Sequence, residues 1–252
     1  MNKLINIALI FLVFSACKDF SLESKKKTVK NTMFIGIDVS GSYTGTQSFR
    51  DGISFLSHYI YYHLHQTAGL TRPTDLYVGG IGGNDKEDPQ AFYPIHDFDG
   101  RTIEQIKDKL TREFAKQKDN LTDFNEFFAR VKTITKQKNL VLSPISIVLL
   151  TDGVAEIAAG VKDKKIIKQA YSKIDVSPLE YLSNDVSIRL LYVSPSVGSH
   201  WRSYVPTSRI KIWTVETEVM KGWADQLRFK GKDGLCKWIR DNVDLRIMSR
   251  GH

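Results

Sequence analysis

Cysteine and histidine are scarce in this sequence, and their scarcity excludes several classes of site. The 252 residues include two cysteines, Cys17 and Cys236, and six histidines. No cluster of these residues has the spacing of a zinc site. Cys236 lies in LCKWIRDNV on a predicted helix, where a small buried side chain is its expected role. Nothing near it in the sequence supplies the base that a catalytic thiol requires.

Several catalytic motifs are missing too. The chain has neither the Walker lysine pattern nor G-x-S-x-G. The stretch FIGIDVSGS, residues 34–42, resembles the first phosphate loop of the actin-like sugar kinases, in which an aspartate and small residues handle Mg²⁺ and phosphate. That fold needs a duplicated domain and a second glycine-rich loop, and this chain shows neither clearly. A Mg²⁺-dependent phosphotransfer enzyme is therefore the weaker alternative, and we expect a protein that is not an enzyme.

Long apolar runs are absent outside the N-terminus. Residues 1–16 contain Lys3, an apolar stretch from Ile5 to Phe14 and two small residues, which is the pattern of a secretory signal. The sequence FSAC resembles the lipobox of bacterial lipoproteins. This resemblance implies cleavage before Cys17, lipidation of Cys17, and a membrane-anchored location in the bacterial cell envelope, on its periplasmic or surface face. An ordinary signal peptide with an incidental cysteine is the alternative.

Residues 17–31 are predicted to form a polar tether rather than part of the fold. They lack apolar periodicity and include four lysines, Lys25, Lys26, Lys27 and Lys30. The chain has a formal net charge of +8, with much of the basic excess after Trp201. We interpret the lysines as a solvated spacer beside an anionic membrane surface, and we expect no binding to nucleic acid.

The remaining sequence alternates predicted strands and helices, which is typical of an α/β protein. Apolar runs and alternation predict the strands, and apolar residues three or four apart predict the helices. Strands are predicted at 33–38, 75–81, 91–98, 144–151, 186–193 and 209–215. Helices are predicted at 46–66, 102–117, 122–136, 164–173, 216–228 and 233–243. The expected fold is a three-layer α/β/α sandwich, Rossmann-like, with a mostly parallel sheet and one antiparallel edge strand.

For two connections of this fold, the sequence allows more than one interpretation. The stretch from Ser194 to Ser208 is barely long enough for a parallel crossover, so the direction of the last strand is left open. Its Trp201 and Tyr204 either form a binding rim or pack the loop down. The turn GGNDKEDPQ, residues 82–90, contains three acidic residues that either form a solvated loop or contact a partner or a second cation, namely Asp85, Glu87 and Asp88.

Oxygen-bearing side chains follow two of the predicted strands. The first strand ends at Asp38, which Ser40 and Ser42 follow, and the strand SIVLL ends in Thr151, Asp152 and Gly153. Ligands of open parallel sheets bind outside the carboxyl ends of the strands. Thr122, at the expected N-cap of the helix beginning DFNEFF, is predicted to lie there too. Hard oxygen ligands with few charges suit Mg²⁺, with Mn²⁺ or Ca²⁺ as alternatives.

These residues resemble the metal-ion-dependent adhesion site of the von Willebrand factor A (vWA) domain. The family pattern is D-x-S-x-S, followed by a separate Thr and a separate Asp, with the serines binding the metal directly and the aspartates often acting through water. DVSGS supplies Asp38, Ser40 and Ser42, and LLTDG supplies Asp152. The separate Thr is best matched by Thr122. Thr111 is a rival that falls inside a helical pattern.

The resemblance covers roughly residues 32–228 and implies a domain organisation and a function. The vWA domain is placed at 32–230, and 231–252 is a C-terminal helical extension. The implied function is that of a lipid-anchored protein-binding module, whose protein partner offers an acidic side chain to the bound Mg²⁺. The alternative is a scaffold of an envelope complex that works without metal.

Overall fold

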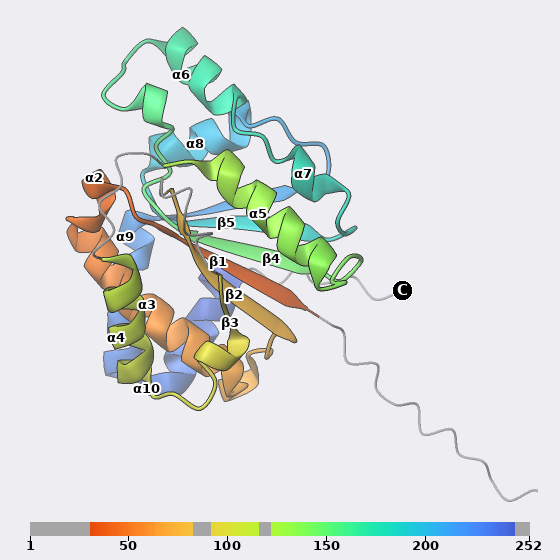
Figure 1. Cartoon of the computed structure of the whole chain (residues 1–252). Coiled ribbons are helices and arrows are strands. Elements are labelled where there is room, and N and C mark those ends of the chain that lie inside the picture. Colours follow the sequence, from red (N-terminus) through yellow and green to blue (C-terminus); the bar gives the residue numbers. More distant parts are fainter. Residues whose placement is uncertain (1–30, 83–91, 116–121, 245–252) are drawn as a thin grey trace, which may run out of the picture.

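The computed structural model describes residues 31–82, 92–115 and 122–244 as one α/β body (Figure 1). The predicted signal segment, Cys17, the tether before Asn31 and the acidic turn with Asp85, Glu87 and Asp88 lie outside these residues. Within the described part, no helix has both the length and the apolar character needed to cross a membrane.

The centre of the body is a six-stranded sheet with the order β3-β2-β1-β4-β5-β6. The strands are β1 (Thr32–Asp38), β2 (Asp75–Ile81), β3 (Tyr93–Pro94), β4 (Ile145–Leu150), β5 (Val186–Val193) and β6 (Lys211–Glu216). All neighbours pair in parallel except β2 and β3, which are antiparallel. The strand order reverses between β1 and β4, which is where open α/β sheets place their ligands. The predicted fold class is confirmed.

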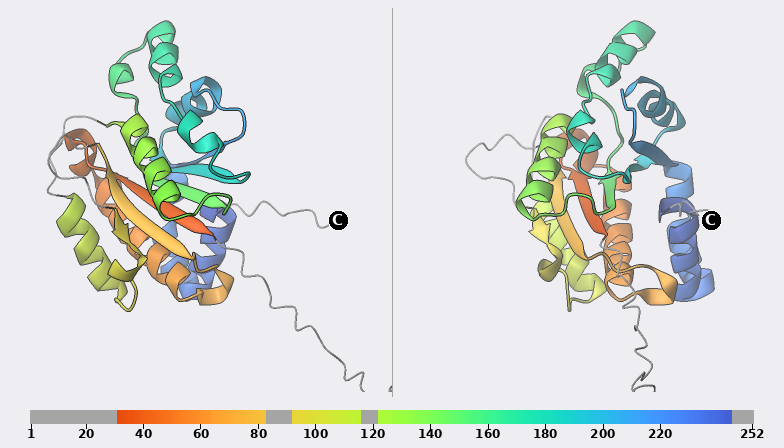
Figure 2. Two further views of the ribbon diagram at one scale, coloured as in Figure 1. Left: turned by 45° about the vertical axis from the view of Figure 1, so that its right-hand side comes forward. Right: turned by 90° about the vertical axis from the view of Figure 1, so that its right-hand side faces the viewer.

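The first face of the sheet is covered by α3 (Gln47–Leu64), α4 (Ile103–Phe114) and α10 (Trp223–Ile239) (Figures 1 and 2). Side chains alternate between faces along a strand, so Met33, Ile35 and Ile37 of β1 enter this core. A Cβ on Gly52 of α3 would lie 2.3 Å from the side chain of Leu150. The glycine therefore allows α3 to pack directly on β4.

The opposite face is covered by α5 (Phe124–Gln137), α6 (Lys164–Ser172), α7 (Ser177–Glu180) and α8 (Pro195–Tyr204). Their buried residues pack against Phe34 of β1 and Leu149 of β4, among others. Short elements complete the chain: α2 (Gly41–Thr44), α9 (Thr217–Met220), the 3₁₀ turns Thr67–Gly69, Ile95–Asp97 and Glu156–Ala158, and the π-helical turn Arg240–Asp244. The sheet thus has a separate apolar core on each face.

Two local predictions change in the structure, and one open question is settled. The return strand predicted at 91–98 is reduced to Tyr93–Pro94, because Pro94 has no N–H for the ladder and a 3₁₀ turn begins at Ile95. The open direction of the last strand is settled, since the stretch after Ser194 forms helix α8 and β6 is parallel to β5. Thr122 is not an N-cap. That position belongs to Asp123, whose side chain accepts from the N–H of Glu126.

The C-terminal segment packs on the first face of the sheet. The predicted break between its two helices corresponds to Gly231, which has a non-helical backbone (φ 64°) inside α10. Leu235, Cys236 and Ile239 are buried in the same core as the sheet. The buried hydrophobic role expected of Cys236 is therefore confirmed.

Candidate metal centre

The side chain of Asp38 ends β1 and is the centre of a hydrogen-bonded cluster at the carboxyl edge of the sheet. Its Oδ1 accepts from the amide of Ser40 (2.9 Å) and from the hydroxyl of Thr122 (3.3 Å). Its Oδ2 accepts from the hydroxyl of Thr151 at 2.7 Å. Only 1% of Asp38 is exposed. Three donors therefore hold this carboxylate in place at the point where the strand order reverses.

The two serines of the DVSGS turn continue the cluster toward solvent. Ser40 is buried and Ser42 is exposed, and their hydroxyl oxygens lie 3.3 Å apart. Ser42 is part of the one-turn helix α2, which directs the chain from β1 into α3. The three residues taken from the D-x-S-x-S pattern thus form one connected run from the buried strand end to the surface.

Thr122 reaches the cluster from the other side of the sheet. It directly precedes Asp123, which caps α5 in its place, so the hydroxyl of Thr122 is available to donate to Asp38. A hydroxyl that donates a hydrogen bond to a carboxylate keeps the lone pairs of its oxygen for another partner. The rival residue, Thr111, lies within α4 and is not part of this cluster.

Asp152 follows β4 and is the second carboxylate at this edge. Its Oδ1 accepts from the amide of Val154 at 3.0 Å, which fixes the carboxylate in a tight turn. The next residue, Gly153, has φ +70°, and a Cβ there would lie about 3 Å from Val197 and Trp201. Trp201 is fully buried and donates from Nε1 to the carbonyl of Gly153 at 2.8 Å. It packs the turn instead of forming a binding rim.

Thr151 is the member of the cluster to which sequence reasoning gave no role. It is fully buried, donates to Asp38 and accepts from the amide of Gly153 at 2.9 Å. Its hydroxyl therefore connects the two aspartate-bearing turns. The sequence did contain a signal for this role, because Thr151 directly follows the apolar run SIVLL. A residue at the end of one parallel strand lies at the same sheet edge as the last residue of its neighbour, which here is Asp38.

Both carboxylates resist ionisation in this environment. Burial raises the pKa of Asp38 by more than the hydrogen bonds from Thr151, Ser40 and Thr122 lower it. Burial also raises the pKa of Asp152, the Val154 amide lowers it, and the charge of Asp38 raises it further. No basic side chain of the described residues is among the groups that set the pKa of either carboxylate.

The donor set fits a hard divalent cation in composition. The cluster offers carboxylate and hydroxyl oxygens and no nitrogen or sulfur ligand, which favours Mg²⁺, Mn²⁺ or Ca²⁺ over zinc. Among the residues described, no group of three or more His, Cys, Asp or Glu side chains could hold a metal ion. A cation bound here would therefore depend on hydroxyl ligands beside two carboxylates.

A cavity of about 270 Å³ adjoins this cluster at Thr122. Phe124, Ala155, Ile157 and Ile174 give it apolar walls, and Ile157 is 58% exposed. The surface beside the candidate metal centre is thus hollow and partly apolar.

Neither a protein-family model nor a curated protein matches the sequence of this chain.

Proposed function

We propose that this chain is a lipid-anchored protein-binding module of the vWA type, which holds a partner through a divalent cation, Mg²⁺ in the first place. The observation that carries the proposal is the cluster around Asp38, in which Ser40, Thr122 and Thr151 all donate to one buried carboxylate at the strand-order reversal. Ser42 and Asp152 border the same cluster.

In this proposal the hydroxyls of Ser40, Ser42 and Thr122 and the carboxylates of Asp38 and Asp152 hold the cation. The cation, once bound, supplies a Lewis-acidic centre for an acidic side chain of the partner. Asp38 orients the hydroxyl of Thr122 by accepting a hydrogen bond from it, and Thr151 fixes Asp38 from the end of the next strand. Two protein carboxylates balance the charge of a divalent cation without exceeding it, and the coordination positions that water would hold stay open to a third carboxylate.

The cavity beside Thr122 supports a protein as partner. Its walls combine apolar side chains with the polar side chains of Asn125, Glu156 and Lys173. Binding interfaces pair an apolar centre with a polar rim, and this hollow begins at one of the proposed ligands. The N-terminal signal pattern and Cys17 place the module at the cell envelope in the same proposal, anchored by lipid.

The first test is direct titration of Mg²⁺ into purified protein by calorimetry. Ser42→Ala removes an exposed hydroxyl from the cluster at little structural cost, and we expect it to weaken Mg²⁺ binding about tenfold. Ser172→Ala, an exposed serine at the end of α6, is the matched control and should bind as the wild type does. Equal affinity of all three proteins would reject the metal centre.

The second test separates adhesion from metal-independent scaffolding. Partners are captured from native membranes with Mg²⁺ and again with EDTA, using wild type and Asp38→Ala. Loss of the same partners in EDTA and in the variant, with the circular dichroism spectrum retained, is the expected result. Capture that survives both changes would favour the scaffold, and ATP binding in a nucleotide titration would favour the phosphotransfer enzyme.

A further inference from the structure

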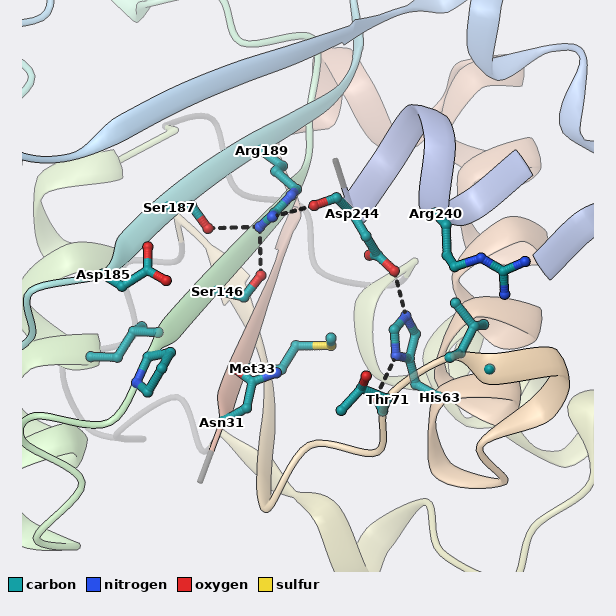
Figure 3. A pocket seen from close by; sticks show the side chains of 14 residues that line it. Asn31, Met33, His63, Thr71, Ser146, Asp185, Ser187, Arg189, Arg240 and Asp244 are labelled. Atoms are coloured by element: carbon teal, nitrogen blue, oxygen red, sulfur yellow. Dashed lines mark hydrogen bonds and ion pairs between the residues drawn. The ribbon is translucent and has the colours of Figure 1, made fainter. Parts of the chain in front are cut away.

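A second polar cavity lies at the opposite edge of the sheet, among the amino-terminal halves of β1, β4 and β5. Its volume is about 310 Å³. Figure 3 shows its wall, with Arg189, Ser146 and Ser187 on neighbouring strands, and His63 and Asp244 facing them. The volume is at the lower end of the range of small-molecule sites, which is about 300–1,000 Å³.

Arg189 is a buried cation in this wall, and its hydrogen-bond partners are all neutral. Arg189 is only 9% exposed. Nη1 donates to the hydroxyl oxygens of Ser146 (2.6 Å) and Ser187 (2.7 Å), and Nη2 donates to the backbone carbonyl of Asp244 (2.6 Å). Its Nε has no hydrogen-bond partner among the described residues. A buried charge is costly unless an opposite charge offsets it.

Two carboxylates line this wall, and both are engaged by other groups. Asp185 lies 3.7 Å from Nζ of Lys211. Oδ1 of Asp244 accepts from the hydroxyl of Tyr59 at 2.8 Å, and its Oδ2 lies 3.3 Å from Nε2 of His63. Arg240, which also lines the cavity, donates to the carbonyl of Ala68. Within the described part of the chain neither arginine forms an ion pair. The wall thus holds two arginines and two aspartates, and because each aspartate lies beside another basic side chain, neither is paired with Arg189 among the described residues.

The serine hydroxyls beside Arg189 provide a second, independent feature. Ser146 and Ser187 both accept from the guanidinium, and in the described structure neither donates its own proton to another group. Two hydroxyl donors and a guanidinium thus converge on one side of the cavity. Met33 and Ile145 supply apolar surface next to them.

We propose that this cavity binds a small organic anion, whose carboxylate or phosphate group takes hydrogen bonds from the two serines and neutralises Arg189. The apolar part of the ligand packs on Met33 and Ile145. The site is separate from the candidate metal centre, since it lies at the amino ends of the strands whose carboxyl ends bear Asp38 and Asp152. A solely structural Arg189, which ties Asp244 to the sheet, would need no anion.

The test uses inorganic phosphate and hexanoate as probes on the full chain, by calorimetry in the presence of EDTA so that no metal at the other edge contributes. We expect wild type to bind at least one probe with a dissociation constant below about 10 mM. Arg189→Met should weaken that binding at least about tenfold. Arg209→Gln, which removes an exposed arginine outside the cavity, is the control and should leave binding unchanged.

The double variant S146A/S187A keeps the guanidinium and removes both hydroxyl donors. It gives an answer even where Arg189→Met does not fold, and we expect it to weaken the same probe about tenfold. Absence of binding of both probes to wild type overturns the proposal. Affinity of the double variant equal to that of wild type overturns it as well.

Discussion

The hydroxyl of Thr151 donates to Oδ2 of Asp38 across the boundary between β4 and β1, at 2.7 Å. The register explains this contact, because Ile37 pairs with Leu150 and the next residues of the two strands are Asp38 and Thr151. The bond joins the turn that bears the serines to the turn that bears Asp152. Thr151 is therefore the residue on which the relative position of the two acidic turns depends.

Replacement of Thr151 by valine preserves the volume of the side chain and removes this bond. Asp38 loses one donor and the amide of Gly153 loses its acceptor, so we expect the free energy of unfolding to fall by about 1–3 kcal/mol. Urea denaturation measures this change. Thr135→Val is the matched control, because Thr135 is equally buried and its hydroxyl has no partner in the described structure. It should be neutral or stabilising, and an equal loss in both variants would contradict the prediction.

Replacement of Asp152 by asparagine should have opposite effects with and without Mg²⁺. In EDTA the variant loses the repulsion between Asp38 and Asp152 while its side-chain oxygen can still accept from Val154, so it should be at least as stable as wild type. At about a hundred times the dissociation constant, Mg²⁺ should stabilise wild type by about 2.7 kcal/mol. The variant should lose most of this increment.

The control for this comparison is Asp175→Asn. The carboxylate of Asp175 accepts from the amide two residues later at 2.9 Å, as that of Asp152 does, but Asp175 is exposed and distant from the cluster in sequence. Thermal unfolding in EDTA and in Mg²⁺ gives both quantities for each protein. A Mg²⁺ increment that remains intact in Asp152→Asn would remove Asp152 from the metal centre.

The acidic turns were predictable from sequence because each follows an apolar strand. Parallel strands end at a common edge, so the positions of Asp38 and Asp152 follow from the apolar runs before them. The contribution of Thr151 was not predictable, since it depends on the exact register of β1 and β4. The N-cap assignment of Thr122 was wrong because Asp123, one residue later, is also a good cap.

The second cavity lay beyond sequence reasoning for a related reason. Arg189 and Asp244 are 55 residues apart, and His63 comes from a third element, so no local pattern brings them together. The direction of β6 likewise depended on whether the stretch after Ser194 was helical. A helix advances only about 1.5 Å per residue, so a helical crossover of this length covers little distance. The stretch Ser194–Ser208 nevertheless brings the chain back to the edge of the sheet where β5 begins, and β6 is parallel to β5.

Asp51 of α3 accepts from two buried donors and should be important for stability. Tyr192 donates to its Oδ2 at 2.5 Å, and Nε1 of Trp223 donates to its Oδ1 at 3.1 Å. Asp51→Ala leaves both donors without an acceptor, and we expect a loss of about 3 kcal/mol in the free energy of unfolding. In a background with Tyr192→Phe the same substitution should cost clearly less. Equal costs in both backgrounds, measured by urea denaturation, would show that the pair is not coupled.

The ion pair of His63 and Asp244 predicts a pH-dependent contribution to stability. Burial lowers the pKa of His63, but the charge and hydrogen bond of Asp244 and the Thr71 carbonyl outweigh burial and raise that pKa overall. Burial raises the pKa of Asp244, but the charge and hydrogen bond of His63, with Tyr59 and Arg189, lower it overall.

The raised pKa of His63 stabilises the fold at pH values below the unfolded pKa of histidine, about 6.5. This contribution to stability is lost as pH rises through the folded pKa. The lowered pKa of Asp244 stabilises the fold above the unfolded value of aspartate, about 3.9, and is lost as pH falls through the folded pKa.

The pair should therefore contribute most between about pH 4 and pH 6.5 and much less near about pH 9. A double-mutant cycle with His63→Gln and Asp244→Asn measures this contribution as a coupling free energy, independently of what each substitution costs alone. We expect the coupling from urea denaturation at about pH 5.5 to exceed that at about pH 9, because only the lower pH keeps His63 protonated opposite the Asp244 carboxylate. A coupling that is the same at both pH values would mean that a neutral hydrogen bond, and not the ion pair, holds the Arg240–Asp244 turn against α3.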